Sequence, residues 1–266
     1  MFKGYAIKKF AEGAEFKFWV GDEIGQAWYD TPRSTPLTQA ELDQPNRNFF
    51  AGQPAPAFDP SGWLEMQFIR IHLVRLGDVV FECGAHHGLT TMLFASWVGP
   101  EGKVFAFESA IANYEFIQKI IALNRLNHVT AYNKAVGREK CAVEISSESN
   151  SVVQRSDNVF AASTEVAEMV PLDDYAHLKP SFIKIDVEGC EVDVLKGARR
   201  ILQNKRRLAI EVHADDLLGY HGSSVEELLG ILNAQRYELW IHWDAASIRV
   251  PYDGSPITTR VHLFAM

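Results

Sequence analysis

Residues 79–99, VVFECGAHHGLTTMLFASWVG, and residues 103–109, KVFAFES, decide the fold. A short apolar run is followed by a turn with glycines at both ends, a longer apolar stretch and a second short apolar run. This order predicts a buried strand, a tight turn, a helix and a second buried strand. Consecutive units of this kind build a parallel sheet with right-handed crossovers.

The same alternation continues along the chain. The expected strands are 128–137, 182–189 and 208–213, and the expected helices are 112–126, 191–202 and one that begins after Ser224. The polar stretch 138–172 predicts short edge strands at 141–145 and 169–172, and the chain ends in a strand pair at 237–243 and 257–266. The predicted fold class is α/β, a doubly wound, mostly parallel Rossmann-like sheet with a C-terminal antiparallel strand pair.

The first 60 residues differ from the rest and are expected to form an N-terminal extension. Two aromatic-rich runs within 13–30, on either side of Gly21 and Asp22, predict a small hairpin. Prolines recur from Pro32 to Pro60, and because proline breaks helices and removes ladder donors, 31–60 predicts an irregular wrapping segment. Residues 61–266 are assigned to the main domain, which opens with a helix after Pro60.

The composition is that of a globular protein with a small partner. The 266 residues are 47% hydrophobic, and 26 Lys and Arg against 34 Asp and Glu give a formal charge of −8. An acidic balance supplies no broad positive field, which disfavours general binding of nucleic acid. The three cysteines are too few for a disulfide framework, no run approaches a membrane span, and the N-terminus lacks a signal-peptide pattern. The expected location is the cytoplasm, with no membrane partner.

The turn after the first strand and the acid after the second strand predict a nucleoside-containing cofactor. In doubly wound sheets, ligands bind beyond the carboxyl ends of the strands, where strand order reverses. Glu108 ends the second strand, 20 residues after Gly88, and a carboxylate there can accept hydrogen bonds from both ribose hydroxyls. His86 stands where a second glycine would admit a pyrophosphate, which disfavours a nicotinamide dinucleotide.

A series of motifs, in this order and spacing, resembles the FkbM family of S-adenosylmethionine-dependent methyltransferases. The motifs are ECGAHHG (82–88), FAFE (105–108), LDD (172–174), KIDVEG (184–189), Glu191 with VLKGA (194–198), and IE (210–211). The resemblance covers about residues 78–215, and KIDVEG is its most distinctive part. It implies a class I methyltransferase domain over 61–266, and the aromatic stretch at 13–30 resembles the family's common upstream hairpin.

The resemblance also implies which residues surround the cofactor. The residues implied around its methionine part are Glu82, Gly84, Ala85 and Gly88, the ribose ligand is Glu108, and the residues near the adenine are Ser109, Lys134 and Ala135. The sequence departs from the family at two of these positions. Glu82 stands where the family often has Asp, and Ser109 stands where it often has Pro. Neither change removes an interaction that the cofactor needs.

The family implies methylation of a hydroxyl, which requires alignment of the acceptor and removal of its proton. The candidate groups follow the fourth and fifth strands: Asp186, Glu188, Glu211 and His213. His213 is the natural base, because a neutral imidazole accepts a proton near neutral pH. The carboxylates and the imidazole also suit Mg²⁺ or Mn²⁺, although no dedicated metal site is assigned. A simpler role for Asp186 and Glu188 is to stabilise the N-terminus of the helix that they precede.

The sequence therefore predicts a methyltransferase that acts on an oxygen of a small molecule or saccharide, with Asp186, Glu188 and His213 as the catalytic candidates. Residues 1–60 and 145–172 are expected to cover the acceptor pocket. Alternatives stay open: N-methylation or methylation of a macromolecule, an oxidoreductase with a dinucleotide, and a cofactor-binding protein without catalysis.

Overall fold

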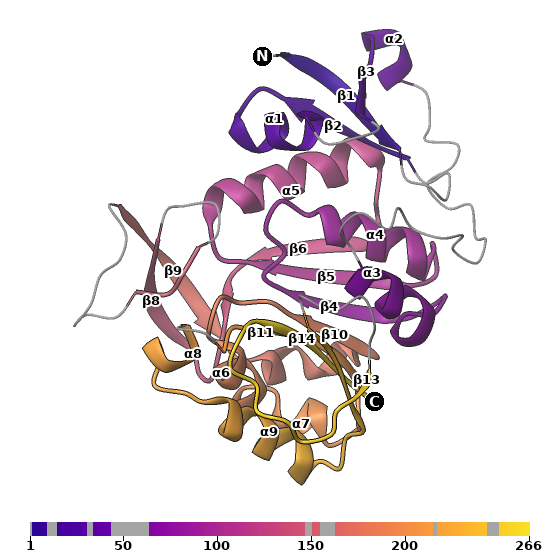
Figure 1. The fold of residues 1–266 in the computed structure, drawn as a ribbon. Coiled ribbons are helices and arrows are strands. Elements are labelled where there is room, and N and C mark those ends of the chain that lie inside the picture. The colour runs from indigo at the N-terminus through magenta and orange to yellow at the C-terminus, as the bar shows by residue number, and fades with distance from the viewer. Residues whose placement is uncertain are drawn as a thin grey trace.

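An eight-stranded sheet forms the centre of the protein (Figure 1). The computed structural model describes residues 2–9, 15–30, 34–43, 64–146, 151–154, 163–214, 217–243 and 250–266. The strands of the central sheet are β4 (Val79–Cys83), β5 (Lys103–Glu108), β6 (Val129–Asn133), β10 (Phe182–Ile185), β11 (Arg207–Val212), β12 (Leu239–Trp243), β13 (Val250–Pro251) and β14 (Val261–Ala265). Their order across the sheet is β13-β12-β14-β11-β10-β4-β5-β6.

Strand order reverses between β4 and β10. The chain runs outward from β4 through β5 to β6, and then returns to the other side of β4 with β10 and β11. These five strands are parallel, whereas β14 is antiparallel to both of its neighbours, β11 and β12. The predicted sheet and its C-terminal antiparallel pair are confirmed. The reversal places the expected ligand site above the carboxyl ends of β4 and β10.

Helices cover both faces of the sheet (Figure 1). One face packs against α3 (Leu64–Phe68), the π-helical turn η1 (Ile69–Leu73), α4 (Leu89–Val98) and α5 (Ile111–Asn124). The other face packs against η2 (Leu172–Leu178), α6 (Glu191–Lys196), α7 (Arg199–Leu202), α8 (Leu217–Tyr220) and α9 (Val225–Ala234). In the described parts of the chain, no helix combines the length and the apolar character that crossing a bilayer requires.

The helix predicted at 191–202 is divided into α6 and α7. The division falls at Gly197, where a Cβ atom would lie 2.0 Å from the backbone oxygen of Gly137. Only glycine admits so close an approach of two backbones. The spacing of apolar residues did not indicate this break, because it continues from α6 into α7.

The N-terminal extension forms a three-stranded sheet in the order β2-β1-β3. Its elements are β1 (Gly4–Lys9), β2 (Glu15–Val20), α1 (Glu23–Asp30), β3 (Ser34–Pro36) and α2 (Gln39–Leu42). The hairpin predicted around Gly21 and Asp22 is wrong, because the second aromatic run is the helix α1, and β2 pairs instead with β1. Asp22 accepts a hydrogen bond from the backbone of Gly25, which favours a helix start over a strand turn. Most of the predicted wrapping segment, 44–60, lies outside the described residues.

The extension packs directly on α5 (Figure 1). The backbone nitrogen of Lys17 in β2 donates to Asn124 Oδ1 at 2.7 Å, and Asn124 Nδ2 donates to the Lys17 oxygen at 2.8 Å. Phe16 and Phe18 are fully buried in the same apolar cluster as Phe116 of α5. The described part of the extension therefore shares a core with the main sheet.

A third sheet lies beside the carboxyl end of β6. It contains β7 (Ala135–Val136), β8 (Cys141–Ser146) and β9 (Thr164–Val170), in the order β7-β9-β8. The edge strand predicted at 141–145 is confirmed, and the one predicted at 169–172 begins earlier, at Thr164. Residues 151–154 return along this sheet, where Val153 bridges to Ile145.

Gly88 supplies a test of the turn between β4 and α4. It has a positive φ of 77°, and an added Cβ would lie 2.9 Å from Ile117 Cγ1. We predict that Gly88→Ala lowers the free energy of unfolding by about 1–2 kcal/mol through backbone strain, and by about 1–3 kcal/mol more through the clash with Ile117. Urea titration measures the loss.

Gly77→Ala is the matched control. Gly77 has a nearly identical φ of 80°, and nothing lies within 4 Å of its added Cβ. The control should show the strain without the clash. Equal losses in the two variants would show that Gly88 is not needed for packing against α5.

Candidate active site

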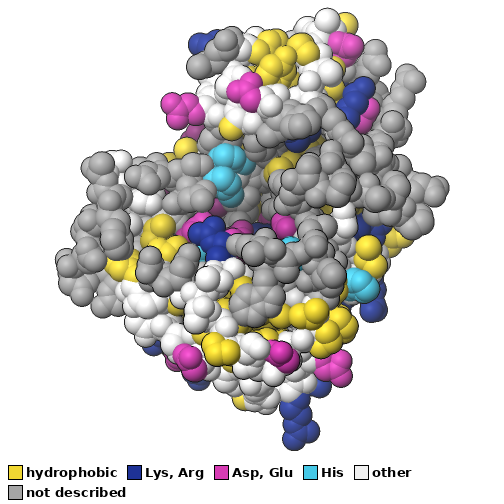
Figure 2. Space-filling view, in the orientation of Figure 1, with side chains coloured by type: hydrophobic (Ala, Val, Ile, Leu, Met, Phe, Trp, Pro, Cys, Tyr) yellow, Lys and Arg dark blue, Asp and Glu magenta, His cyan; other side chains and the backbone are white. Residues whose placement is uncertain are grey.

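A cavity of about 290 Å³ opens at the carboxyl ends of β4, β5, β10 and β11. Figure 2 shows His, acidic and basic side chains gathered around the hollow in the middle of this face. We call it the first cavity. Eight of the candidate residues from the sequence line it: Gly84, Glu108, Ser109, Lys134, Ala135, Asp186, Glu188 and Glu211.

Beneath this cavity, the turn after β4 packs against the loop after β10 and against the strand β5. A Cβ atom on Gly84 would lie 1.7 Å from the backbone oxygen of Asp186, so only glycine fits between the loops after β4 and β10. The backbone nitrogens of Gly84 and Ala85 both donate to the Phe107 oxygen of β5, at 3.0 and 3.1 Å. His86 adopts a left-handed conformation with φ of 51°. The turn is therefore defined by backbone packing, and it places the His86 side chain in the cavity lining.

Glu108 is the buried acid of the first cavity. Its Oε2 accepts a hydrogen bond from the His86 backbone nitrogen at 2.7 Å, and its Oε1 accepts from the Ala110 nitrogen at 2.9 Å and from Asn113 Nδ2 at 3.4 Å. Burial raises the pKa of Glu108 to about 7. Because a carboxylate can accept about four hydrogen bonds, acceptor capacity remains for a ligand hydroxyl.

Three residues implied around the cofactor lie behind the cavity and do not line it. Glu82 is fully buried, and its carboxylate accepts hydrogen bonds from the Thr90 and Thr91 hydroxyls. Ala85 is buried among apolar residues, and Gly88 faces Ile117. These three residues support the turn after β4 from the side away from the cavity. The family motif alone does not distinguish a residue that lines a cavity from one that supports it.

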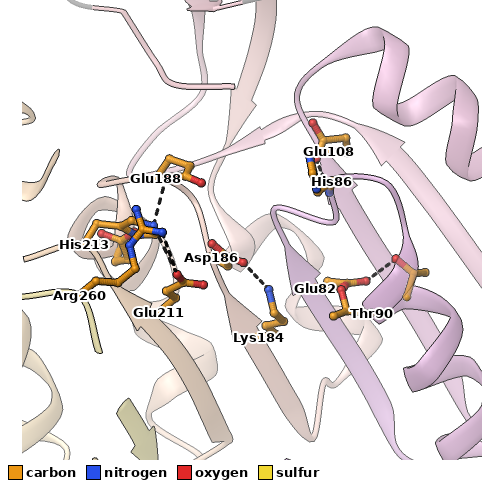
Figure 3. Close-up of polar contacts among 12 residues, drawn as sticks. Glu82, His86, Thr90, Glu108, Lys184, Asp186, Glu188, Glu211, His213 and Arg260 are labelled. Atoms are coloured by element: carbon orange, nitrogen blue, oxygen red, sulfur yellow. Dashed lines mark hydrogen bonds and ion pairs between the residues drawn. The ribbon is translucent and has the colours of Figure 1, made fainter. Parts of the chain in front are cut away.

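Lys184 and Asp186 form an ion pair in the middle of the site (Figure 3). Lys184 Nζ lies 2.7 Å from Asp186 Oδ2, and the Lys184 side chain is only 12% exposed. Burial by itself lowers the pKa of Lys184, but the charges of Asp186 and Glu82 outweigh it and raise that pKa. Burial raises the pKa of Asp186, but Lys184 outweighs it and lowers the pKa below its ordinary value. Both groups are charged at neutral pH.

His213 differs from the sequence prediction of a neutral base. Its ring is fully buried, with Nδ1 at 2.8 Å from Glu191 Oε1 and Nε2 at 3.2 Å from Glu188 Oε2 (Figure 3). Burial by itself would lower the pKa of His213, but the hydrogen bonds and charges of the two glutamates outweigh it and raise the pKa to about 10. Both contacts favour the imidazolium, which has no lone pair to accept a proton, so the structure argues against the neutral imidazole predicted at this position.

Glu211 is a second carboxylate of the cavity, after Glu108, whose pKa lies near neutrality. Its Oε1 lies 3.8 Å from His213 Nε2 and 3.5 Å from Arg260 Nη1 (Figure 3). Burial and the charge of Asp186 raise the pKa of Glu211 to about 7, against the lowering effects of Lys184, His213 and Arg260. Glu211 therefore exists in both protonation states near neutral pH.

Several residues of the site were not singled out from the sequence. Lys184 lies in β10, and Asp186 follows two residues later, directly after the strand ends; this spacing puts both side chains on one face, so the sequence contained the signal. Arg260 reaches the cavity only because β14 lies beside β11, which no local pattern reveals. Ser151 and Val153 line the cavity from the segment beyond β8, and Ser151 Oγ lies 2.9 Å from Ser109 Oγ.

A comparison with protein families decides the identity of the domain. A model described as the methyltransferase FkbM domain matches residues 82–239, more than half of the chain. The chain belongs to the FkbM methyltransferase family. The prediction drawn from the motifs at 82–211 is thereby confirmed.

The fold is shared with a solved structure of an FkbM methyltransferase. The chain is similar to the methyltransferase FkbM of Methylobacillus flagellatus KT, with a TM-score of 0.50 and 20% identity over 82% of this chain and 49% of that one. The chain thus spans about half the length of that FkbM protein. It is also similar to Aeropyrum pernix fibrillarin in complex with natively bound S-adenosyl-L-methionine, with a TM-score of 0.49 and 13% identity over 99% and 94% of the two chains. No protein with a curated description matches the sequence.

The residues of the first cavity fit S-adenosylmethionine, the methyl donor of FkbM enzymes. Glu108 offers a buried carboxylate to hydroxyl groups, and Gly84 brings backbone to the floor of the cavity. Asp186 and Glu188 supply negative charge beside the same space, which suits a cationic ligand.

Asp186, Glu211 and His213 do not fit a divalent cation, although each offers one atom and these atoms lie within 4.8 Å of one another. A ligating imidazole nitrogen must carry no proton, whereas both ring nitrogens of His213 face a glutamate oxygen, at 2.8 and 3.2 Å, which favours a protonated ring. The Lys184 ammonium already occupies one oxygen of Asp186, at 2.7 Å. The alternative of Mg²⁺ or Mn²⁺ at these residues has no support from the donor set.

The charged state of His213 can be measured directly. We predict that its ring signals in NMR spectra titrate with a midpoint near pH 10, and that Glu188→Gln moves this midpoint downward. The pKa of His213 is higher in the folded protein, about 10, than in the unfolded chain, about 6.5. Its charge therefore stabilises the fold fully below about pH 6.5, and this contribution disappears as the pH rises through about 10. The loss of stability in His213→Gln, about 3–5 kcal/mol at pH 6, should therefore shrink toward pH 10. A midpoint near 6.5 would restore His213 as a candidate base.

Proposed function

We propose that the protein transfers a methyl group from S-adenosylmethionine to a hydroxyl of a small molecule or saccharide. The observation that carries the proposal is the arrangement of carboxylates in the first cavity. Glu108 lies on the β5 side, and Asp186, Glu188 and Glu211 lie on the side of β10 and β11. One cavity thus contains both Glu108, which suits the hydroxyls of a nucleoside, and Glu211, whose pKa is about 7.

Glu108 would accept hydrogen bonds from the ribose, and Ser109, Lys134 and Ala135 would lie beside the adenine. When bound, S-adenosylmethionine supplies a methyl group on a positively charged sulfur, and the sulfur keeps the bonding electrons as S-adenosylhomocysteine forms. Asp186 and Glu188 would hold negative charge beside that sulfur before transfer. Gly84 would leave room for the methionine part.

We propose Glu211 as the general base in place of His213. As the new O–C bond forms, the acceptor oxygen becomes acidic, and Glu211 would take its proton. General-base assistance is most efficient when the pKa of the base is near the working pH, and the pKa of Glu211 is about 7. Asp186 is a weaker candidate, because its pairing with Lys184 lowers its pKa.

His213 and Glu188 would act as positioning residues. The imidazolium of His213 contacts Glu188 and Glu191 at 3.2 and 2.8 Å, so it fixes the loop after β10 against the end of β11. Its positive charge also lowers the pKa of Glu211, which burial would otherwise raise further. N-methylation is the second candidate, since the same carboxylates would attract an amine.

The cofactor assignment is tested by binding. We predict that Glu108→Gln weakens binding of S-adenosylhomocysteine about 10- to 100-fold, on the scale of ~1.5–3 kcal/mol for a charged hydrogen bond. Because hydroxyl donors favour the ionised acid, wild-type affinity should also rise between about pH 6 and 8, and this dependence should disappear in the variant. Calorimetry measures both effects.

Glu115→Gln, an exposed change on α5, is the control and should bind like the wild type. Unchanged affinity in a folded Glu108→Gln protein would remove Glu108 from the site. Stabilisation of the wild type by NAD⁺ and not by S-adenosylhomocysteine in a thermal-shift assay would overturn the methyltransferase proposal.

The base is tested by rate. A panel of alcohols and glycosides, assayed through release of S-adenosylhomocysteine, identifies an acceptor that turns over. With that acceptor we predict that Glu211→Gln lowers kcat by about 10²–10⁴-fold, while the affinity for S-adenosylhomocysteine changes little. The wild-type rate should rise with pH through about 7, as Glu211 ionises.

Glu211→Asp keeps the carboxylate and should retain part of the activity that Glu211→Gln loses. Addition of EDTA should leave the wild-type rate unchanged, whereas loss of activity restored by Mg²⁺ would show a metal-assisted reaction. Full activity in Glu211→Gln would assign proton removal to another group.

A further inference from the structure

A second cavity adjoins the first. It has a volume of about 190 Å³ and lies between α3 with η1 on one side and β10, β11 and β14 on the other. Asp186 and Glu211 line both cavities. The two carboxylates of the proposed reaction therefore stand where the cavities meet, with Glu108 on the far side of the first cavity.

The alternation of side chains along the strands explains this placement. On β11 and β14, residues two apart share a face, so Glu211 follows Ala209, and His262 precedes Phe264. Glu211 and His262 are also paired in register across the two strands. The sheet thus presents an apolar floor at Ala209 and Phe264, and a polar end at Glu211 and His262.

The opposite wall comes from the segment before β4. Met66 of α3 and Ile69 of η1 are 1% and 2% exposed, and both line the second cavity. With Phe264 they give the cavity apolar walls on two sides. A ligand that fits must therefore combine an apolar surface with polar groups at one end.

The charges around the second cavity select against an anion. Three carboxylates line it, those of Glu65, Asp186 and Glu211, against one ammonium, that of Lys184, and one imidazole, that of His262. This ammonium lies 2.7 Å from Asp186 and is already neutralised there. A phosphate or carboxylate would meet net repulsion, whereas hydroxyl groups can donate to carboxylate oxygens.

We propose that the second cavity binds the methyl acceptor, and that the acceptor enters it as an uncharged, hydroxyl-bearing ring. The inference rests on the proposed function and adds the place and the chemical class of the acceptor. The volume is about six times the ~30 Å³ that a water molecule takes in the liquid, which suits one six-membered ring or the end of a larger molecule. The C–H face of the ring packs on Phe264 and Met66, and one hydroxyl points to Glu211 at the junction.

Methionine methyl groups report binding in this cavity. The protein is labelled with ¹³C at its methionine methyls and saturated with S-adenosylhomocysteine, whose binding is measured separately by calorimetry. Met66 lines the second cavity, whereas Met92 and Met169 line neither cavity and serve as references within the same spectrum. Three probes with one ring are titrated: methyl glucopyranoside, which is neutral, methyl glucosaminide, which is a cation, and methyl glucuronide, which is an anion.

We expect the neutral glycoside to shift the Met66 methyl signal saturably, with a Kd on the order of millimolar, and to leave Met92 and Met169 unmoved. The anion should bind at least about tenfold more weakly. Ile69→Phe fills the cavity and should abolish the shift without changing the affinity for S-adenosylhomocysteine. Ile71→Phe is the matched control, because Ile71 lies on the same turn but is 67% exposed and lines neither cavity.

Each outcome has one reading. Failure of S-adenosylhomocysteine to bind would remove the proposed function. Normal binding of S-adenosylhomocysteine, with a Met66 signal that no glycoside moves, would overturn the second cavity as the acceptor site. A shift that persists in Ile69→Phe would do the same.

Tighter binding of the cation than of the neutral glycoside would overturn the uncharged hydroxyl acceptor and favour an amine. If Ile69→Phe does not fold, the comparison of Met66 with the reference methyls in the wild type still decides.

Discussion

The pairing of the Lys184 ammonium with Asp186 is the interaction on which the polar face of the sheet depends. Lys184 lies in the centre of the sheet, in register with Glu82 on β4, and its nitrogen is 2.7 Å from Asp186. Burying an unpaired ammonium costs several kcal/mol, and removing one partner of a buried pair costs about 3–5 kcal/mol. Glu82 faces Lys184 from the neighbouring strand and is held by two threonines, which explains why it does not line the cavity.

The charges of Asp186 and Glu211 follow from this pair. Asp186 stays ionised because Lys184 is beside it, and the ionised Asp186 in turn raises the pKa of Glu211. His213 is buried as well, but here two glutamates favour the positively charged form of the ring. The result is one carboxylate that holds a fixed negative charge and one that titrates near neutral pH, side by side where the two cavities meet.

Local patterns in the sequence predicted most of the fold, because short apolar runs and helical spacing are properties of single elements. The parallel strands, the C-terminal strand pair and the ligand end of the sheet followed from them. The hairpin at Gly21 failed because aromatic residues suit the buried face of a helix as well as a strand. The local pattern could not indicate the charge state of His213, because its pKa depends on Glu188 and Glu191, whose contact with the ring is a product of tertiary packing. Arg260 was missed because it lies in the cavity only through the pairing of β14 with β11, and these strands are distant in the sequence.

The two cavities differ in how the chain builds them. The first is lined mainly by turns that directly follow β4, β5 and β10, where a glycine or an acid next to a strand has a position fixed by the strand itself. The second is closed by α3 and η1, which precede the first strand of the main sheet, and by β14, which ends it. Met66, Ile69 and Phe264 belong to elements other than those that carry the backbone contacts at Gly84 and the pair at Lys184. A fold built in this way can retain one methyl donor while its acceptor pocket varies, since the residues that would select the acceptor are separate from those that hold the charges in place.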